Sequence, residues 1–462
     1  MKANKSLLNE DKENEICKQM VTKTNANNAV TFFFISRLFK LSNLSKISLC
    51  FIERFFPMAA DSENFLELDF NSVVKIVQSS DLLIDTEIQV FNVADRWLSY
   101  NKKRSKYTKD LLSRIRLLLL TVPALNHILR KKSCFTMNNE CVDIINEALE
   151  NKKGLHLNKI STTSRFCTQK DFNIVVCGGK LIQNSARDVV SDVFSIATNN
   201  TDNIKKLSQM KTARQYSKAV CVGGEVYVFG GIDADADIVS VERYSPVTNA
   251  WEIVADMHDD RENFCACSFV DSVYVFGGYL EGKINSCVKF DIKTRQWKKV
   301  AEMNEARSHA SCAVFQGRIV VSGGVNDERL NTVEVYDHIA DMWSYMPNMT
   351  VQRFNHKSVA VQDKLFIVGG IWSRTCEIFD STSCRFISLK PNKSSLEELL
   401  MFPAEVFSVG KKLVVFSNQM NATLHYDVEI DEWSEKLCEV TENLQDYCCA
   451  KLPTQNFQCC AQ

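Results

Sequence analysis

Short apolar runs recur through the second half of the chain, and each one ends at a pair of glycines. The runs are 173–177, 225–229, 272–276, 318–322 and 364–368, and the pairs are Gly178-Gly179, Gly230-Gly231, Gly277-Gly278, Gly323-Gly324 and Gly369-Gly370. Runs of this length and composition predict buried β-strands, and glycine permits a positive φ and close backbone approach at the strand end. Beyond the first interval the pairs are 46 or 47 residues apart, which indicates a repeat architecture.

Two further patterns keep step with the glycine pairs. An aromatic residue stands seven positions before a second large aromatic in five consecutive units: Tyr244 and Trp251, Phe290 and Trp297, Tyr336 and Trp343, Phe379 and Phe386, Tyr426 and Trp433. The polar stretch between the two members predicts strand, tight turn and strand. A Met-x-x-x-Arg pattern then precedes the next strand, and its arginines are Arg214, Arg261, Arg307 and Arg353.

Each unit therefore holds four predicted strands, and such units repeated around an axis form a β-propeller. We expect Trp251, Trp297, Trp343 and Trp433 to pack between blades. The repeat arginines are expected to donate hydrogen bonds to buried carbonyls rather than bind a ligand, because a guanidinium offers five donors in a fixed fork. A sixth unit carries Ser417-Asn418 in place of the glycine pair, yet Tyr426 and Trp433 follow on schedule. The predicted fold is a six-bladed propeller.

The two ends of the repeat region predict how the ring closes. The first unit starts at Asp171 without the strand that follows a Met-x-x-x-Arg pattern elsewhere. One short apolar run, 447–452, remains after Trp433. We expect this C-terminal run to supply the missing strand, since closure of the ring removes free sheet edges.

The glycine pair, the aromatic couple and the Met-x-x-x-Arg pattern together resemble the kelch repeat over about residues 171–453. The chain departs from that repeat in three places. Phe194 has no tryptophan seven residues later, Phe386 stands in place of a tryptophan, and Ser417-Asn418 replaces a glycine pair. We expect the blades that carry these departures to pack less tightly.

The first half of the chain predicts helices. Residues 86–98 place one apolar stripe on a helix, with Asp85 or Thr86 as its N-cap. The stripe consists of Val90, Phe91, Ala94, Trp97 and Leu98. Further helices are predicted at 109–120 and at 139–149, and in the latter the residues expected to face inward are Cys141, Ile144, Ile145, Ala148 and Leu149.

Segments 51–56, 63–68, 78–83, 87–97 and 114–119 resemble the BACK domain of kelch-like proteins, although Leu118 stands where that family commonly has proline. BACK followed by a kelch propeller is the architecture of the BTB-kelch family. The resemblance implies an all-α domain before the all-β propeller. The predicted boundaries are a disordered tail at 1–26, a BACK-like domain at 27–150, a linker at 151–170, the propeller at 171–455 and a tail at 456–462.

Members of that family begin with a BTB domain, and no BTB core is recognisable here. The 26 residues before the BACK resemblance are rich in Lys, Asn, Glu and Thr, which predicts a solvated tail. Two explanations stay open: a natural relative without BTB, or an incomplete gene model. Because family members dimerise through BTB, the chain without it is expected to be monomeric.

Charge and hydropathy restrict the expected cellular compartment and the expected binding partners of the protein. The net charge is −1, so no long-range attraction to nucleic acid or to an anionic membrane is expected. The N-terminus is charged and lacks the apolar core of a secretory signal. The apolar stretch 29–39 is too short to span a bilayer. We expect a cytoplasmic protein, with association with the cytoskeleton as the alternative.

The sequence predicts no catalytic centre, no metal site and no cofactor. The 18 cysteines are scattered without a C-x-x-C pattern and are expected to be reduced. Several on the repeat strands are expected to be small core residues, with a redox-sensing thiol as the less favoured alternative. The seven histidines do not converge as the ligands of a copper oxidase would. No glycine-rich phosphate loop, G-x-S-x-G or H-E-x-x-H motif is present. The chain is therefore not expected to be an enzyme.

Two loop positions in each blade are expected to line one rim of the propeller, where rigid scaffolds carry recognition. They are the residues after each glycine pair and the residues after each repeat arginine. The family resemblance implies that this rim binds the partner. The candidate residues are Lys180, Tyr216, Ile232, Glu262, Asn263, Tyr279, Ser308, His309, Asn326, Phe354, Asn355 and Trp372. Tyr279, Phe354 and Trp372 are the candidate anchors, since aromatic residues dominate binding hot spots.

The family resemblance implies a non-catalytic substrate-recognition adaptor of a cullin-3 RING E3 ubiquitin ligase. The propeller would hold the target protein, and residues 27–60 would contact cullin-3. Such an adaptor raises the local concentration of its target near the ubiquitin-charged enzyme. Two alternatives remain: an actin-binding cytoskeletal scaffold, and a decoy without BTB that binds targets without ubiquitin transfer.

Overall fold

The computed structural model divides the chain into two compact units, one of residues 1–167 with 454–462 and one of residues 168–453. The described residues are Met20, 28–153, 172–183, 186–197, 204–233, 236–361, 364–381, 383–389, Leu400, 403–409, 411–417, 422–437 and 444–453. The predicted tails at 1–26 (Met20 apart) and 456–462 lie outside these residues, as does the predicted linker after Lys153. Residues 151–153 continue a helix, so they are not linker.

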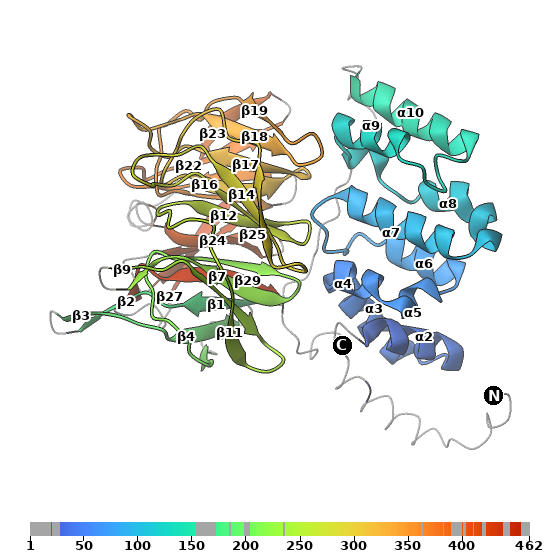
Figure 1. The fold of residues 1–462 in the computed structure, drawn as a ribbon, viewed down its shortest axis with the longest axis horizontal. Helices are drawn as coiled ribbons and strands as arrows, with labels where there is room; N and C mark the ends of the chain where they lie inside the picture. The colour runs from blue at the N-terminus through green and yellow to red at the C-terminus, as the bar shows by residue number, and fades with distance from the viewer. Residues whose placement is uncertain are drawn as a thin grey trace. The chain divides into compact units, whose positions relative to one another are not determined.

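The first unit is all-α, and its helices follow one another along the unit in chain order (Figure 1). The α-helices are α2 (Ala29–Phe39), α3 (Ser42–Arg54), α4 (Phe56–Asp61), α5 (Glu63–Leu66), α6 (Phe70–Val77), α7 (Glu87–Tyr100), α8 (Thr108–Leu112), α9 (Val122–Arg130) and α10 (Asn139–Lys153). Two 3₁₀ turns, η1 (Lys102–Tyr107) and η2 (Leu117–Leu119), connect them. No helix among the described residues is both long enough and apolar enough to cross a membrane.

Helix α7 forms the centre of this unit. Thr86 and Gln89 make a capping box at its start, which confirms Thr86 as the N-cap. All five residues of the predicted apolar stripe are buried. The indole N–H of Trp97 donates to the Leu68 carbonyl at 3.0 Å, and the Arg104 guanidinium lies 4.1 Å from the centre of its ring. Burial on one face and specific polar contacts at Trp97 thus fix α7 in place.

The predicted helix at 109–120 is wrong in extent. Helix α8 ends at Leu112, and the chain continues through i→i−3 turns into η2. The backbone N–H of Arg116 donates to the buried carboxylate of Glu87, at 2.9 Å. An N–H that bonds a side chain of another helix cannot join an α-helical ladder, so a tertiary contact overrides the local helical preference.

The second unit contains six four-stranded antiparallel sheets among its described residues, and each sheet is a blade. From the innermost strand outward, blade 1 is β29 (Cys448–Pro453), β1 (Phe172–Cys177), β4 (Val193–Ala197) and β5 (Ile204–Lys206). Blade 2 is β6 (Lys218–Val222), β7 (Glu225–Phe229), β10 (Ser240–Ser245) and β11 (Ala250–Asp256). Blade 3 is β12 (Cys265–Phe269), β13 (Ser272–Phe276), β14 (Cys287–Asp291) and β15 (Gln296–Val300).

The remaining blades repeat this order. Blade 4 is β16 (Ser311–Phe315), β17 (Arg318–Ser322), β18 (Val333–Asp337) and β19 (Met342–Met346). Blade 5 is β20 (Lys357–Val361), β21 (Lys364–Val368), β22 (Cys376–Asp380) and β23 (Arg385–Leu389). Blade 6 is β24 (Pro403–Val409), β25 (Lys412–Ser417), β26 (Ala422–Asp427) and β27 (Glu432–Leu437). Short strands β2 (Lys180–Gln183), β3 (Ala186–Val189), β8 (Ile232–Asp233), β9 (Ala236–Asp237) and β28 (Leu444–Gln445) lie in connecting loops.

The ring closes through the C-terminal strand, as the sequence predicts. Strand β29 pairs with β1 from Phe172 opposite Pro453 to Cys177 opposite Cys448. Each innermost strand also contacts the next: β6 with β12, β12 with β16, β16 with β20, β20 with β24, β24 with β29, and β29 with β6. The first blade is therefore built from both ends of the propeller sequence, and the six blades form a closed circle.

The aromatic couples face each other directly across neighbouring strands. Tyr244 pairs with Trp251, Phe290 with Trp297, Tyr336 with Trp343, Phe379 with Phe386, and Tyr426 with Trp433. Their ring centres lie 4.9–5.2 Å apart. Trp251, Trp343 and Trp433 are buried, whereas Trp297 is partly buried against the same kind of cluster. The predicted role of these residues in core packing is confirmed.

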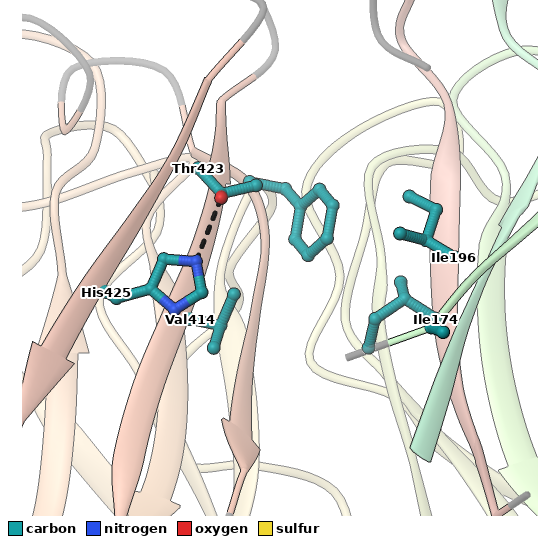
Figure 2. A pocket seen from close by; sticks show the side chains of 7 residues that line it. Ile174, Ile196, Val414, Thr423 and His425 are labelled. Atoms are coloured by element: carbon teal, nitrogen blue, oxygen red, sulfur yellow. Dashed lines mark hydrogen bonds between the residues drawn. The ribbon is translucent and has the colours of Figure 1, made fainter. Parts of the chain in front are cut away.

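Blade 1 has no aromatic couple at this position. Ile196 pairs with Ile204 at the register of the aromatic couple, so Phe194 is not the counterpart of the tyrosines. A cavity of about 20 Å³, enough for one water molecule, lies between blades 6 and 1, and Ile196 is part of its lining. Figure 2 shows Ile174 and Ile196 on one side of it and Val414, Thr423 and His425 on the other. This cavity borders the blade for which looser packing is expected.

The tryptophans provide a test of packing in the blades. Trp343→Ala is expected to lower the free energy of unfolding by about 3–5 kcal/mol, because it removes a buried ring that packs against Tyr336 and a hydrogen bond to the Ala301 carbonyl. Trp297→Ala should fall at the lower end of the same range of about 3–5 kcal/mol, since its ring is partly exposed. Urea denaturation of both variants checks this order, and an equal or reversed order contradicts it.

Candidate partner-binding rim

The repeat arginines hold the loops at one end of the blades. Each is buried, and each donates through one guanidinium nitrogen to the carbonyl of the first glycine of a pair, at 2.7–3.1 Å. The same nitrogen donates to a second carbonyl at the start of the third strand, at 2.7–3.2 Å. The predicted role of Arg214, Arg261, Arg307 and Arg353 is therefore confirmed.

Buried glutamates complete these arginine sites, and the sequence reasoning missed them. Glu242, Glu334 and Glu377 have fully buried side chains and pair with Arg214, Arg307 and Arg353 at 2.7, 2.8 and 3.0 Å. In blade 3, Val288 occupies the register of these glutamates. Arg261 there pairs with Asp259 instead, at 2.5 Å. The repeating Glu two positions before the first aromatic of three couples was the signal available in the sequence.

The two sets of predicted rim positions lie side by side. Their backbones form short antiparallel bridges, which join Lys180 to Gln445, Ile232 to Gln215, Tyr279 to Glu262, and Val325 to Ser308. In blade 5, Ile371 donates its N–H to the Phe354 carbonyl at 3.1 Å. Except at Gln445, which follows no repeat arginine, each bridge joins the loop after a glycine pair to the loop after a repeat arginine. Residues that are distant in sequence therefore share one rim.

A second set of backbone bonds runs from blade to blade. Asn355 donates its N–H to the carbonyl of His309 at 2.9 Å, and His309 donates to Asn263 at 2.8 Å. Tyr216 donates in the same way to Asp446 at 3.1 Å. All five residues adopt a left-handed backbone, with φ between 52° and 56°. The geometry places Asn263, His309 and Asn355 in one continuous row across blades 3 to 5.

Three rim aromatics are presented to solvent. Trp372 is 72% exposed, Tyr216 50% and Tyr279 47%. Phe354 is half-buried, lies 6.4 Å from the His309 ring, and is covered by the Arg329 guanidinium at 5.3 Å. Tyr279 and Trp372 are thus exposed and stay candidate anchors, whereas the Phe354 ring packs with His309 and Arg329.

Some rim residues differ from expectation. Ser308 is buried and its hydroxyl donates to the Val325 carbonyl at 3.4 Å, so its side chain is not available to a partner. Gln445, Asp446 and Arg329 belong to the rim but were missed. Blade 1 lacks the Met-x-x-x-Arg pattern before β29, which removed the signal for Gln445 and Asp446. Asn326 lies in the loop after Val325 and donates its N–H to Glu328.

The rim is acidic on blades 2 and 3. Partial burial raises the pKa of the Glu262 carboxyl, and the neighbouring Asp237 and Asp260 carboxylates raise it further. At the neighbouring blade, burial lowers the pKa of His309, and the Lys218 ammonium adds to that effect. His309 is therefore mostly neutral at pH 7 and adds little positive charge to the rim.

His356 lies directly after the row residue Asn355 and is expected to make the stability of the propeller depend on pH. Burial lowers its pKa from 6.5 to about 3, and its Nε2 is 2.8 Å from the Ser322 hydroxyl. Because the folded pKa is depressed, the unfolded chain binds the extra proton below pH 6.5. We expect stability to fall by up to about 1.4 kcal/mol per pH unit between pH 6 and pH 4. Urea denaturation across this range should show a shallower dependence for His356→Gln, and an unchanged dependence would contradict the prediction.

Among the described residues, no group of three or more His, Cys, Asp or Glu side chains is arranged to hold a metal ion. The rim offers backbone-positioned loops, exposed aromatic rings and carboxylates. Such a surface is suited to binding a protein segment.

Comparison with known proteins agrees with both units. The model of the family described as BTB And C-terminal Kelch (BACK) matches residues 29–130. The model described as KLHDC2/KLHL20/DRC7 Kelch-repeats domain matches residues 164–370, a range that contains all five glycine pairs. The class of protein is thus a BACK domain joined to a kelch-repeat propeller.

Curated proteins that are similar to this chain are kelch-like proteins. Kelch-like protein 9 of Mus musculus is 25% identical over 271 residues, 57% of this chain and 43% of that protein. Kelch-like protein 31 of Homo sapiens is 27% identical over 271 residues, 56% of this chain and 42% of that protein. Kelch-like protein 28 of Mus musculus is 28% identical over 282 residues, 57% of this chain and 48% of that protein. The match spans less than half the length of each relative. The chain is thus similar to kelch-like proteins over part of their length.

Proposed function

We propose that the protein is a non-catalytic substrate-recognition adaptor of a cullin-3 RING E3 ubiquitin ligase. The observation that carries the proposal is the combination of a BACK unit with a propeller whose rim presents Tyr216, Tyr279 and Trp372 to solvent. Kelch-like relatives support the adaptor class. In this scheme the rim binds the target protein, and the ubiquitin-charged enzyme is brought near by the other unit.

The surface of α2 supports a contact for cullin-3 within residues 27–60. Helix α2 is apolar on both faces: Ala29, Val30 and Phe33 are buried, while Leu38 and Phe39 are each 57% exposed. Exposed apolar side chains gathered on one short helix are typical of a protein–protein contact. The buried face packs on α3, so the exposed face is available for a partner.

A pull-down of the chain with cullin-3 tests the proposal, with a BTB-containing kelch-like protein as positive control. Leu38→Asp should abolish binding, whereas Ile387→Asp, an exposed apolar residue of the propeller, should leave it unchanged. Binding that is lost with Leu38→Asp supports the adaptor role. Absence of binding by the unmodified chain rejects it and directs attention to co-sedimentation with actin filaments or to accumulation of bound targets, the outcomes of a scaffold and of a decoy.

Target recognition is tested at the rim. Once a target is captured, Trp372→Ala is expected to weaken its binding about 30-fold, equivalent to roughly 2 kcal/mol for a hot-spot aromatic. Because Trp372 is mostly solvent-exposed, the melting temperature should not change. Met342 is an apolar residue on the outermost strand β19 of blade 4 and is also mostly exposed, so Met342→Ala is the matched control and should bind normally.

A further inference from the structure

Two cysteines meet where the ring of blades closes. Cys177, the last residue of β1, lies directly opposite Cys448, the first residue of β29. Directly opposed residues of antiparallel strands have Cα atoms about 4.5–5.5 Å apart, which is within the range of about 4.4–6.8 Å that a disulfide requires. The two residues are 271 positions apart in the chain, so a bond between them would join the two ends of the propeller.

The two thiols interact with each other and are set in an environment that makes them unequal. Both are buried, and the Cys448 sulfur is 3.5 Å from the Cys177 carbonyl and 3.2 Å from the Ser217 hydroxyl. A hydrogen bond from the Cys177 thiol lowers the pKa of Cys448, and the Ser217 hydroxyl and the positive charges of Lys218 and Arg214 contribute to the same effect. Burial, together with this thiol contact, raises the pKa of Cys177. Cys448 is therefore the better nucleophile of the pair.

The neighbouring residue provides an internal comparison. Cys449 is also buried, but it lies opposite Val176 and points to the other face of the strand. Cys448 packs with Cys177, Met210 and Tyr244, whereas Cys449 packs with Phe407 and Phe416 of blade 6. Only Cys448 can reach Cys177 without a shift in strand register.

We propose that Cys177 and Cys448 are a site of disulfide modification that covalently seals the propeller ring. This proposal does not depend on the adaptor function. The oxidant is a small-molecule disulfide such as oxidised glutathione. The Cys448 thiolate attacks one sulfur of the oxidant, forms a mixed disulfide and releases one small thiol.

The second step completes the bond. Cys177 loses its proton and attacks the Cys448 sulfur of the mixed disulfide, which forms the Cys177–Cys448 bond and releases the second small thiol. Two protein thiols are oxidised and one small disulfide is reduced to two thiols. Since both sulfurs are buried once β29 has docked, the reaction takes place as the strand docks during folding or when it opens transiently.

Peptide mapping of the full chain tests the proposal. The reduced protein is treated with oxidised glutathione in two arms, once in the native state and once during refolding, and free thiols are then blocked before non-reducing digestion. We expect a linked pair of peptides that contain Cys177 and Cys448 in the refolding arm at least. Absence of this pair in both arms, or a link from Cys177 to Cys449 instead, overturns the proposal.

A thermal measurement distinguishes the specific bond from other thiol chemistry. Closing so long a loop is expected to raise the melting temperature by roughly 10 °C in the oxidised protein relative to the reduced protein. Each variant is compared with its own reduced form, so a loss of baseline stability does not affect the result. Cys449→Ser should retain the shift and Cys448→Ser should lose it. An equal shift in Cys448→Ser would assign the effect to another pair, such as Cys265 and Cys312, and overturn the proposal.

Discussion

Ending the chain at Leu437, after the last strand of blade 6, is expected to unfold the whole propeller rather than one blade. This truncation removes β29, which supplies the innermost strand of blade 1 and contacts both β6 and β24. Four of its side chains are buried: Cys448, Cys449, Ala450 and Leu452. Domains are stable by only about 5–15 kcal/mol, and loss of this ladder and core removes a comparable amount. Circular dichroism of the chain that ends at Leu437 should lack the cooperative thermal transition of the β-sheet signal that the complete chain shows.

A second truncation serves as the control. Ending the chain at Pro453 keeps all of β29 and removes only residues 454–462, so the propeller should melt as the complete chain does. If the chain that ends at Leu437 melts cooperatively at an unchanged temperature, ring closure by β29 does not stabilise the propeller. The comparison therefore isolates the closing strand from a general effect of shortening the C-terminus.

Repetition explains why most of the propeller could be predicted from the sequence. A glycine pair alone is a weak signal, but its phase with Tyr336 and Trp343, and with Arg307, repeats in several units. The pairing of β29 with β1 was also predictable. The first unit lacked one strand, and the C-terminal end had one predicted strand beyond the four of its own unit. Where a unit departs from the repeat, prediction fails: the register of blade 1 is set at Ile196 rather than Phe194.

At the rim, tertiary contacts limit what can be predicted from the sequence. Spacing placed Asn263, His309 and Asn355 at equivalent positions, and the structure joins them in one row. Spacing does not reveal side-chain exposure, and Ser308 is buried although its counterpart Glu262 is exposed. The end of α8 at Leu112 likewise depends on a bond from Arg116 to Glu87, about 30 residues away in the chain. Local pattern thus identifies the positions of the rim, and packing decides which of them face a partner.

Replacing Glu377 by valine is expected to lower the free energy of unfolding by about 3–5 kcal/mol, because it leaves a buried guanidinium without its counter-ion. Arg353 donates to Glu377 through two nitrogens, at 3.0 and 3.1 Å, and both side chains are fully buried. The same carboxylate also accepts the N–H groups of Thr350 and Val351. Urea denaturation at neutral pH measures the loss.

Glu334→Val is the matched comparison, and its effect is expected to be smaller. Arg307 retains a second carboxylate, Glu305, at 2.9 Å, whereas Val351 stands at the equivalent position beside Arg353. The difference between the two variants should be at least about 1.5 kcal/mol, the lower end of the net contribution of a hydrogen bond to a charged group. Equal losses would mean that the second carboxylate contributes nothing.

Blade 3 suggests how the Glu377→Val variant can be rescued. There Val288 already occupies the glutamate register, and Asp259, two residues before Arg261, supplies the counter-ion at 2.5 Å. Adding Val351→Asp to Glu377→Val reproduces that arrangement in blade 5 and should recover at least half of the lost stability. Val351→Asp alone, with Glu377 present, is the control and should change little, since Val351 is 41% exposed. A double variant no more stable than Glu377→Val would show that the carboxylate position, and not only its charge, decides whether a repeat arginine can be buried.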